Sequence, residues 1–203
     1  MAKLCIIIFI FSQFLCLADS PLTSTYFAEA YKKEKIVLHA ENQKGKIDQK
    51  VIKYLSNDNN AIDVKLACIN AISWNVDGNS NAPILLKKFL KKNKCKNIDE
   101  FLKKGKASDI LCYAYLLSLD DYHHVKEAMY ISQIALSKEP NSYAFNIING
   151  LITAQFLFDI DWCEVYKTCD AVREKKQLQD DFSHQAKEIV FEYMDLYYSS
   201  CEQ

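Results

Sequence analysis

One short acidic and histidine-rich segment holds the side chains in this sequence that are best suited to chemistry. It contains Asp120, His123, His124 and Glu127 within eight residues. An imidazole and a carboxylate one helical turn apart, as expected for His123 and Glu127, can bind zinc or another transition metal. The segment therefore supports the hypothesis of a metal-dependent enzyme centred on the two histidines with Asp120 or Asp121.

The same segment also fits the polar start of a helix. Acidic side chains at a helix N-terminus interact favourably with the positive end of the helix dipole, and histidines beside them are ordinarily solvated. A catalytic metal site needs a further ligand and an open coordination position, and nothing nearby in the sequence marks them. We therefore favour a helix start and expect no cofactor.

Motifs of the common catalytic classes are missing from the sequence. It has no Gly-x-Ser-x-Gly, no His-Glu-x-x-His and no phosphate-binding glycine loop. Its 4 glycines also leave little scope for close backbone approach to a phosphate. His39 and His184 are isolated histidines, and we expect each to be a surface or hydrogen-bonded core residue and not a general base. The sequence therefore favours a non-enzymatic function.

The second conspicuous pattern is a run of lysines between residues 87 and 106. Lysines at a helix C-terminus complement its dipole, so a solvated face is one interpretation. The other is a surface for an anionic partner: an acidic protein, a glycan or lipid phosphates. Nucleic acid is disfavoured because the run lacks arginine, which makes most bidentate base contacts. The candidate partner-binding lysines are Lys87, Lys88, Lys91 and Lys92, and the run continues with Lys94, Lys96, Lys103, Lys104 and Lys106.

Charge is distributed unevenly along the chain. Residues 19–106 hold 17 lysines against 10 acids, a net +7, whereas residues 107–203 hold 7 basic side chains against 16 acids, a net −9. This polarity concerns partners rather than fold, and it permits a salt-sensitive head-to-tail association of copies. Near the C-terminus, Tyr197 and Tyr198 diverge by about 100° on a helix, so they cannot both point inward. An exposed tyrosine there is a further candidate for partner binding.

The first 18 residues form a separate segment. Lys3 is followed by an apolar run from Leu4 to Leu17, and small side chains occupy positions 16 and 18. This order predicts a secretory signal peptide, residues 1–18, cleaved after Ala18. The run is shorter than the about 20 apolar residues that a spanning helix needs, so no transmembrane segment is expected in the mature chain. The protein is predicted to be secreted or periplasmic.

Six cysteines follow the predicted leader, an even number that permits up to three disulfides in an exported protein. Cys163 and Cys169 cannot pair if they share a helix, because six residues rise about 9 Å. Cys68 and Cys112 lie in apolar stretches and are expected to be buried thiols. Cys201 is best placed to fasten the end of the chain. Pairing stays open among Cys68, Cys95, Cys112, Cys163, Cys169 and Cys201.

Helix signals recur throughout residues 19–203, and strand signals are almost absent. A helix is expected over residues 23–34, and the last helix is expected to start at Asp180 or Asp181. The pattern predicts one all-α domain of about ten helices, with short connections that make neighbouring helices antiparallel. Other predicted helix starts are Asp48, Asn97, Ser108, either Asn141 or Ser142, and Asp161.

Four residues in the second half have the spacing of a known helical repeat. Ala128 and Ala135 lie seven residues apart, Pro140 follows five residues later, and Gly150 occurs in the next expected helix. In these positions the stretch 109–160 resembles tetratricopeptide repeats, although Leu116 stands where the family favours a small side chain. The resemblance implies antiparallel helix pairs at about 109–172, stacked as a short α-solenoid. An irregular helical bundle is the alternative.

Stacked helix pairs form extended concave surfaces that suit recognition. We therefore expect an exported helical-repeat protein that binds a protein or peptide, possibly acidic, without catalysis. A small periplasmic inhibitor or immunity-type protein is a narrower form of the same prediction. The metal-dependent enzyme at the histidine segment is the competing hypothesis.

Overall fold

The computed structural model describes residues 19–202, so the predicted leader lies outside the described residues. This part of the chain is helical without strands, apart from one isolated bridge between Ser142 and Gln179, and the predicted all-α class is confirmed. No helix within it is long and apolar enough to cross a bilayer. Its helices are α1 (Pro21–Ser24), η1 (Phe27–Tyr31), α2 (Lys35–Glu41), α3 (Gln49–Leu55), α4 (Ile62–Ile72), α5 (Ala82–Lys92), α6 (Ile98–Lys104), α7 (Ala107–Asp120), α8 (Lys126–Lys138), α9 (Tyr143–Leu157), α10 (Trp162–Arg173), α11 (His184–Met194) and η2 (Asp195–Cys201), where η denotes a 3-10 helix.

Local side-chain capping explains where several helices begin. In four of them the residue before the first turn accepts a hydrogen bond from the backbone N–H three residues later, at 2.9 to 3.2 Å. Such caps satisfy an N–H group that has no partner inside the helix. The four predicted starts that this confirms are Asp48, Asn97, Ser142 and Asp161.

The helix predicted over residues 23–34 is wrong, because the chain there forms α1 and η1 instead. Asn70 of α4 accepts a hydrogen bond from the Ala28 N–H at 2.8 Å and donates one to the Thr25 carbonyl at 3.1 Å. A buried side chain thus takes backbone groups that a continuous helix would have paired within itself. A tertiary contact overrides the local pattern.

The start predicted for the last helix, at Asp180 or Asp181, is also wrong. The Asp181 carboxylate accepts hydrogen bonds from the Ser142 hydroxyl and from the Ala144 N–H at 2.9 Å. Asp181 therefore serves the first turn of α9, and α11 begins only at His184. The helix predicted to start at Ser108 has Lys106 as its cap residue.

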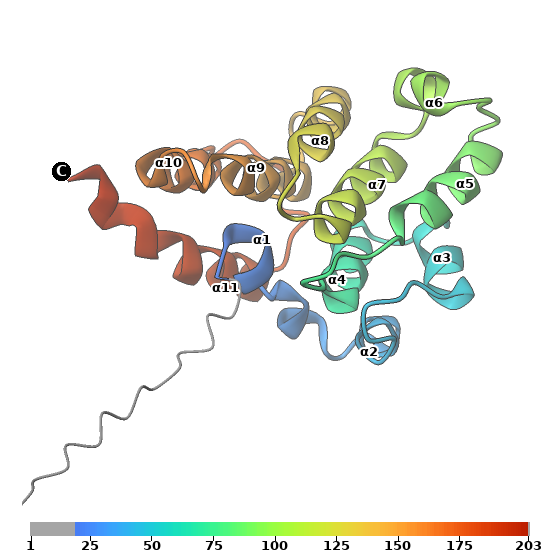
Figure 1. The fold of residues 1–203 in the computed structure, drawn as a ribbon, viewed down its shortest axis with the longest axis horizontal. Helices are drawn as coiled ribbons and strands as arrows, with labels where there is room; N and C mark the ends of the chain where they lie inside the picture. The colour runs from blue at the N-terminus through green and yellow to red at the C-terminus, as the bar shows by residue number, and fades with distance from the viewer. Residues whose placement is uncertain (1–18, 203) are drawn as a thin grey trace, which may run out of the picture.

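The four helices α7 to α10 run back and forth, and each packs against the next (Figure 1). Ala128 and Ala135 are fully buried in α8, where small side chains let neighbouring helices approach. A Cβ atom added to Gly150 of α9 would lie 3.5 Å from the Cys169 sulfur of α10, so this helix pair is close as well. Pro140 is exposed in the turn between α8 and α9.

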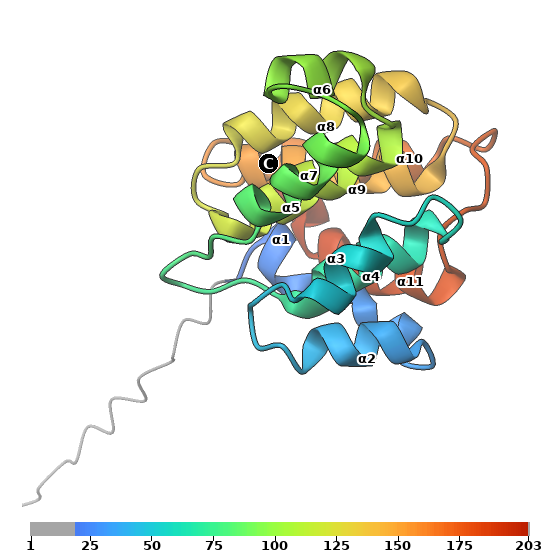
Figure 2. The same cartoon turned by 90° about the vertical axis from the view of Figure 1, so that its right-hand side faces the viewer.

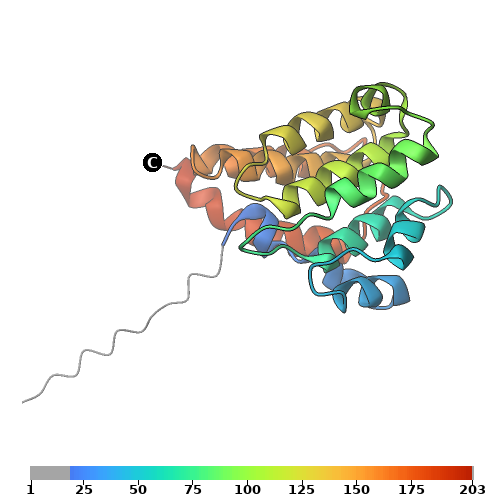
Figure 3. The same ribbon diagram turned by 45° about the vertical axis from the view of Figure 1, so that its right-hand side comes forward.

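Helices α5 and α6 extend this stack, and a second layer lies beneath it. Figures 2 and 3 show α5 to α10 in the upper layer, with α2, α3, α4 and α11 below. Helices α4 and α7 meet between the layers, where the Asn70 amide donates to the Tyr115 hydroxyl at 2.9 Å. The rings of Phe27, Tyr115 and Phe182 pack around this bond, with centroids 5.1 to 6.1 Å apart. One buried cluster of apolar side chains joins both layers.

Candidate functional site

The structure separates the residues of the predicted metal cluster. The Asp120 side chain is buried and accepts hydrogen bonds from Asn81 Nδ2 at 3.2 Å and from the Ala82 N–H at 2.6 Å. It therefore caps the start of α5. Burial raises the pKa of this carboxyl, although the hydrogen bonds that it accepts oppose the shift.

His123, His124 and Glu127 are exposed, and α8 begins only at Lys126. The expectation that His123 and Glu127 share one helix is therefore wrong. The His123 ring stacks on Tyr122, with centroids 4.1 Å apart, and His124 Nδ1 lies 3.0 Å from the Asp121 carboxylate. Within residues 19–202, no three His, Cys, Asp or Glu side chains are placed to hold a metal ion. The geometry gives the metal-enzyme hypothesis no support.

Lys92 lies among acidic side chains. Its ammonium donates to Asp109 Oδ1 at 2.8 Å and also to Asp58, and only 17% of the side chain is exposed. Burial works against the charge of Lys92, but the hydrogen bonds to Asp109 and Asp58 outweigh burial and raise its pKa. The charge of Lys92 is therefore already paired inside the fold, and its role in binding a partner stays a prediction.

The other three predicted lysines, Lys87, Lys88 and Lys91, are exposed on α5. Lys88 borders an open groove of about 710 Å³ between α2, α3 and α5, which we call the lysine groove. Four lysines line it, and no acidic side chain does. Its lining residues are Lys35, Ile36, Lys50, Lys53, Tyr54, Ser56, Asn57, Asn60 and Lys88.

Three short elements bring the groove lysines together. Lys50 and Lys53 lie three residues apart on α3, so they share one face of that helix. Lys35 starts α2, and Lys88 comes from the middle of α5. None of the four has an acidic partner within 4.0 Å among residues 19–202. Their positive charges are therefore available to a ligand.

Tyr54 and Ile36 give the groove an apolar part. Both side chains are half-buried and pack against the core. Burial raises the pKa of Tyr54 to about 12, with smaller contributions from Cys68, Glu34 and Asp63, so its hydroxyl stays neutral at physiological pH. Beside them, the side chain of the exposed Asn57 accepts a hydrogen bond from the Asn59 N–H at 3.1 Å through its oxygen.

Two acids adjoin the lining in sequence: Glu34, which precedes Lys35, and Asp58, between Asn57 and Asn59. Asp58 is paired. Hydrogen bonds from Lys106 and Lys92 lower its pKa to about 2, so it is ionised at physiological pH. Both of its oxygens are occupied by those two lysines. Asp58 therefore pairs with two lysines that do not line the groove. Glu34 has no basic partner within 4.0 Å among residues 19–202 and raises the pKa of Tyr54, so four unpaired lysines stand against this one acid and the groove stays positively charged.

Sequence reasoning named Lys88 but missed Lys35, Lys50 and Lys53. The spacing of Lys50 and Lys53 marks a basic face on a short helix, and that signal was present in the sequence. The convergence of this face with Lys35 and Lys88 was not, because it depends on how α2, α3 and α5 pack.

Tyr197 and Tyr198 lie on η2, at the other end of the molecule from the lysine groove (Figure 1). Tyr197 is half-buried against Phe158 and Trp162, with ring centroids 6.0 and 6.2 Å away. Tyr198 is exposed and packs its ring edge against Tyr166 at 5.3 Å. One tyrosine thus faces inward and the other outward, as their spacing requires.

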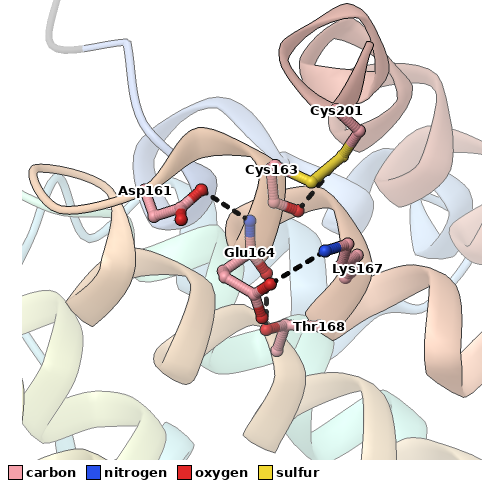
Figure 4. The surroundings of a disulfide bond; sticks show 6 residues. All are labelled: Asp161, Cys163, Glu164, Lys167, Thr168 and Cys201. Atoms are coloured by element: carbon pink, nitrogen blue, oxygen red, sulfur yellow. Dashed lines mark hydrogen bonds and ion pairs between the residues drawn. A yellow bond between two sulfur atoms is a disulfide. The ribbon is translucent and has the colours of Figure 1, made fainter. Parts of the chain in front are cut away.

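A disulfide joins Cys163 of α10 to Cys201 of η2, with Cα atoms 4.7 Å apart (Figure 4). The prediction that Cys201 fastens the chain end is confirmed, and Cys163 is its partner. Cys68 and Cys112 are buried free thiols, as predicted, and Cys169 is a third. Burial raises the pKa of each of these three thiols to about 12, so they are protonated and unreactive.

A short run of α10 supports this disulfide. In Figure 4 the Asp161 carboxylate caps the start of α10. It accepts a hydrogen bond at 3.1 Å from the backbone N–H of Glu164, the residue that follows Cys163. Glu164 in turn pairs with Lys167 at 3.0 Å, and its carbonyl accepts from the Thr168 hydroxyl at 2.7 Å. The first turn of α10 is thus ordered where it receives the bond from η2.

Comparison with known proteins adds no relative: no family model matches the chain, and no curated protein or solved structure does. The candidate site therefore rests on the geometry of the lysine groove.

Proposed function

We propose that this chain is an exported helical binding protein that holds an acidic protein segment in the lysine groove. The observation that carries the proposal is the lining itself, which contains four unpaired lysines and no acid. The volume of about 710 Å³ lies within the usual range of ligand-binding clefts. Grooves with these properties bind extended anionic chains.

The lining favours a polypeptide over a phosphate or a sulfated glycan. Ile36 and Tyr54 offer apolar contact, which suits the hydrophobic side chains of a protein segment. The exposed Asn57 amide can donate to backbone carbonyls. A protein segment in which acidic residues alternate with apolar ones would therefore match this surface.

Export and repeat architecture belong to the same proposal. The Cys163–Cys201 bond supports export, since disulfides persist in oxidising compartments and are rare in the cytosol. The packing of α7 to α10 in successive antiparallel pairs supports a tetratricopeptide-like arrangement. A metal-dependent enzyme receives no comparable support.

The test is binding of a fluorescently labelled peptide of alternating glutamate and leucine, followed by anisotropy. Reversing Lys50 and Lys53 together, Lys50→Glu with Lys53→Glu, removes two attractions and adds two repulsions of about 0.5 kcal/mol each. Affinity should fall at least tenfold. The control is Lys176→Glu, which reverses the charge of one exposed lysine in the α10–α11 connection.

Binding should also weaken as salt is added, because exposed charges are screened within about 10 Å at 0.1 M. A peptide with glutamine in place of glutamate should bind poorly. Equal binding by the groove variant and the Lys176→Glu control would refute the proposal. So would binding of a sulfated glycan at the groove without binding of the acidic peptide.

A further inference from the structure

The end of the molecule opposite the lysine groove presents exposed apolar side chains. Ile160, Trp162, Leu196 and Tyr198 are each 50% to 67% exposed, on the start of α10 with the residues before it and on η2. We call this the aromatic end. Exposed apolar side chains on neighbouring segments are typical of an interaction surface.

The aromatic end is held in shape rather than loosely folded. Trp162 Nε1 donates to the Phe158 carbonyl at 2.7 Å, and its ring lies 6.2 Å from those of Phe158 and Tyr197. The disulfide between Cys163 and Cys201 ties the two segments covalently. Pre-ordered aromatic side chains lose little entropy when they dock, which is why they serve as anchors in interfaces.

Three unpaired acidic side chains lie on the same segments or next to them, one before α10, one on α11 and one after η2. Asp159, Glu192 and Glu202 are exposed and have no cationic partner among the residues that the structure describes. Most of the nearby basic side chains are already paired: Lys167 with Glu164 at 3.0 Å, Arg173 with Asp170 and Asp195 at 2.6 and 2.7 Å, and Lys187 with Asp180 at 2.5 Å. Lys126 lines one pocket with Asp159 and Ile160 and has no acidic partner within 4.0 Å among residues 19–202. Three unpaired acids against one unpaired lysine leave the aromatic end with a net negative charge.

We propose that the aromatic end of one copy docks into the lysine groove of another, head to tail. The charges are complementary, since unpaired acids on one surface meet four unpaired lysines on the other. The apolar anchors also have a receptor, because Ile36 and Tyr54 line a groove of about 710 Å³. This inference rests on the proposed function of the groove and names a second copy as its partner.

The two surfaces lie at opposite ends of the molecule, with α2, α3 and α5 on one side and α10 and η2 on the other (Figures 1 and 3). A copy cannot fill its own groove, so the contact is heterologous and leaves one free surface at each end of a pair. Repeated docking then gives a chain or a ring. Pairing of two aromatic ends is disfavoured, because it would place like charges opposite each other.

Sedimentation velocity with two variants tests the inference. A groove variant, Lys50→Glu with Lys53→Glu, should lack the receptor surface. An end variant, Asp159→Lys with Glu202→Lys, should lack two of the three unpaired acids while its exposed positions keep the fold intact. Association of the unmodified chain should increase with its concentration, and its association constant should be at least tenfold larger than that of either variant alone. Added salt should dissociate the assemblies.

Mixing the two variants gives the decisive result. The end variant still has a groove and the groove variant still has an aromatic end, so together they should form a one-to-one pair and nothing larger. Monomers in the mixture would overturn the inference. Self-association of the groove variant alone would also overturn it, because that result indicates pairing of identical ends.

Peptide binding separates this inference from the proposed function. The end variant keeps the lysine groove, so it should bind the acidic peptide as the unmodified chain does, and the peptide should disperse assemblies of the unmodified chain. Peptide binding without any pair in the mixture overturns head-to-tail docking and leaves the proposed function standing. Failure of the end variant to bind peptide counts against both.

Discussion

Replacing Lys92 by methionine tests whether this lysine stabilises the fold instead of binding a partner. The carboxylate of Asp109 is fully buried, and the Lys92 ammonium is its only cationic partner among residues 19–202. Methionine keeps much of the apolar stem but leaves that carboxylate without its counter-charge. Removing one member of a buried ion pair costs about 3–5 kcal/mol.

The lower end of that range applies here. Asn93 Nδ2 still donates to Asp109 Oδ2 at 2.8 Å, and Lys106 still pairs with Asp58. We therefore expect a loss of about 3 kcal/mol in the free energy of unfolding. For a chain of this length such a loss lowers the melting temperature by about 6–12 °C.

Urea unfolding followed by circular dichroism measures this effect, with Lys91→Met as the matched control. Lys91 is the neighbouring residue on α5, but it is exposed and has no acidic partner, so its replacement should change stability by less than about 0.5 kcal/mol. Adding Asp109→Asn to the Lys92→Met protein should restore part of the loss, because a neutral amide is less costly to bury than an unpaired carboxylate. Equal urea midpoints for Lys92→Met and Lys91→Met would refute the reasoning.

Two further predictions concern the disulfide and acid stability. Replacing Cys163 and Cys201 together by serine should cost about 2–4 kcal/mol, because the bond closes a loop of 38 residues in the unfolded chain; urea unfolding measures this, with Cys95→Ser as the control, and an unchanged midpoint would contradict it. For Asp58, the pKa in the folded state is about 2, below the ordinary value near 3.9, so its contribution is complete at neutral pH and disappears as the pH falls from about 4 to about 2. Because the side chain is 42% exposed, Asp58→Asn should cost only about 1 kcal/mol at pH 7 and nothing near pH 2, and a cost that persists in acid would count against this assignment.

Much of the helical architecture could be predicted from the sequence, because it depends on neighbours along the chain. Asp48, Asn97, Ser142 and Asp161 mark helix starts wherever the chain is placed, since each bonds a backbone N–H three residues later. Scarcity of glycine and proline and the near absence of strand patterns indicated an all-α fold. The burial of Cys68 and Cys112 followed from the apolar stretches around them.

The errors share one physical cause, which is a partner distant in sequence. Asn70 takes the backbone groups that would have continued a helix through residues 25–28, and Asp181 serves α9 instead of starting α11. Asp120 resembled a metal ligand in a local cluster, but it caps α5, 38 residues earlier in the chain. Hydrogen bonds of this kind leave no periodic trace in the sequence.

For the candidate site too, some properties follow from the sequence and others only from the tertiary structure. The sequence by itself determined that one half of the chain is basic and the other acidic, and that lysines gather near α5. Only the tertiary structure decided which charges are free: it buries Lys92 against Asp109 and brings Lys35, Lys50 and Lys53 beside Lys88. Net charge is a sum over residues, whereas an available charge depends on which opposite charges the packing of helices places within a few ångströms.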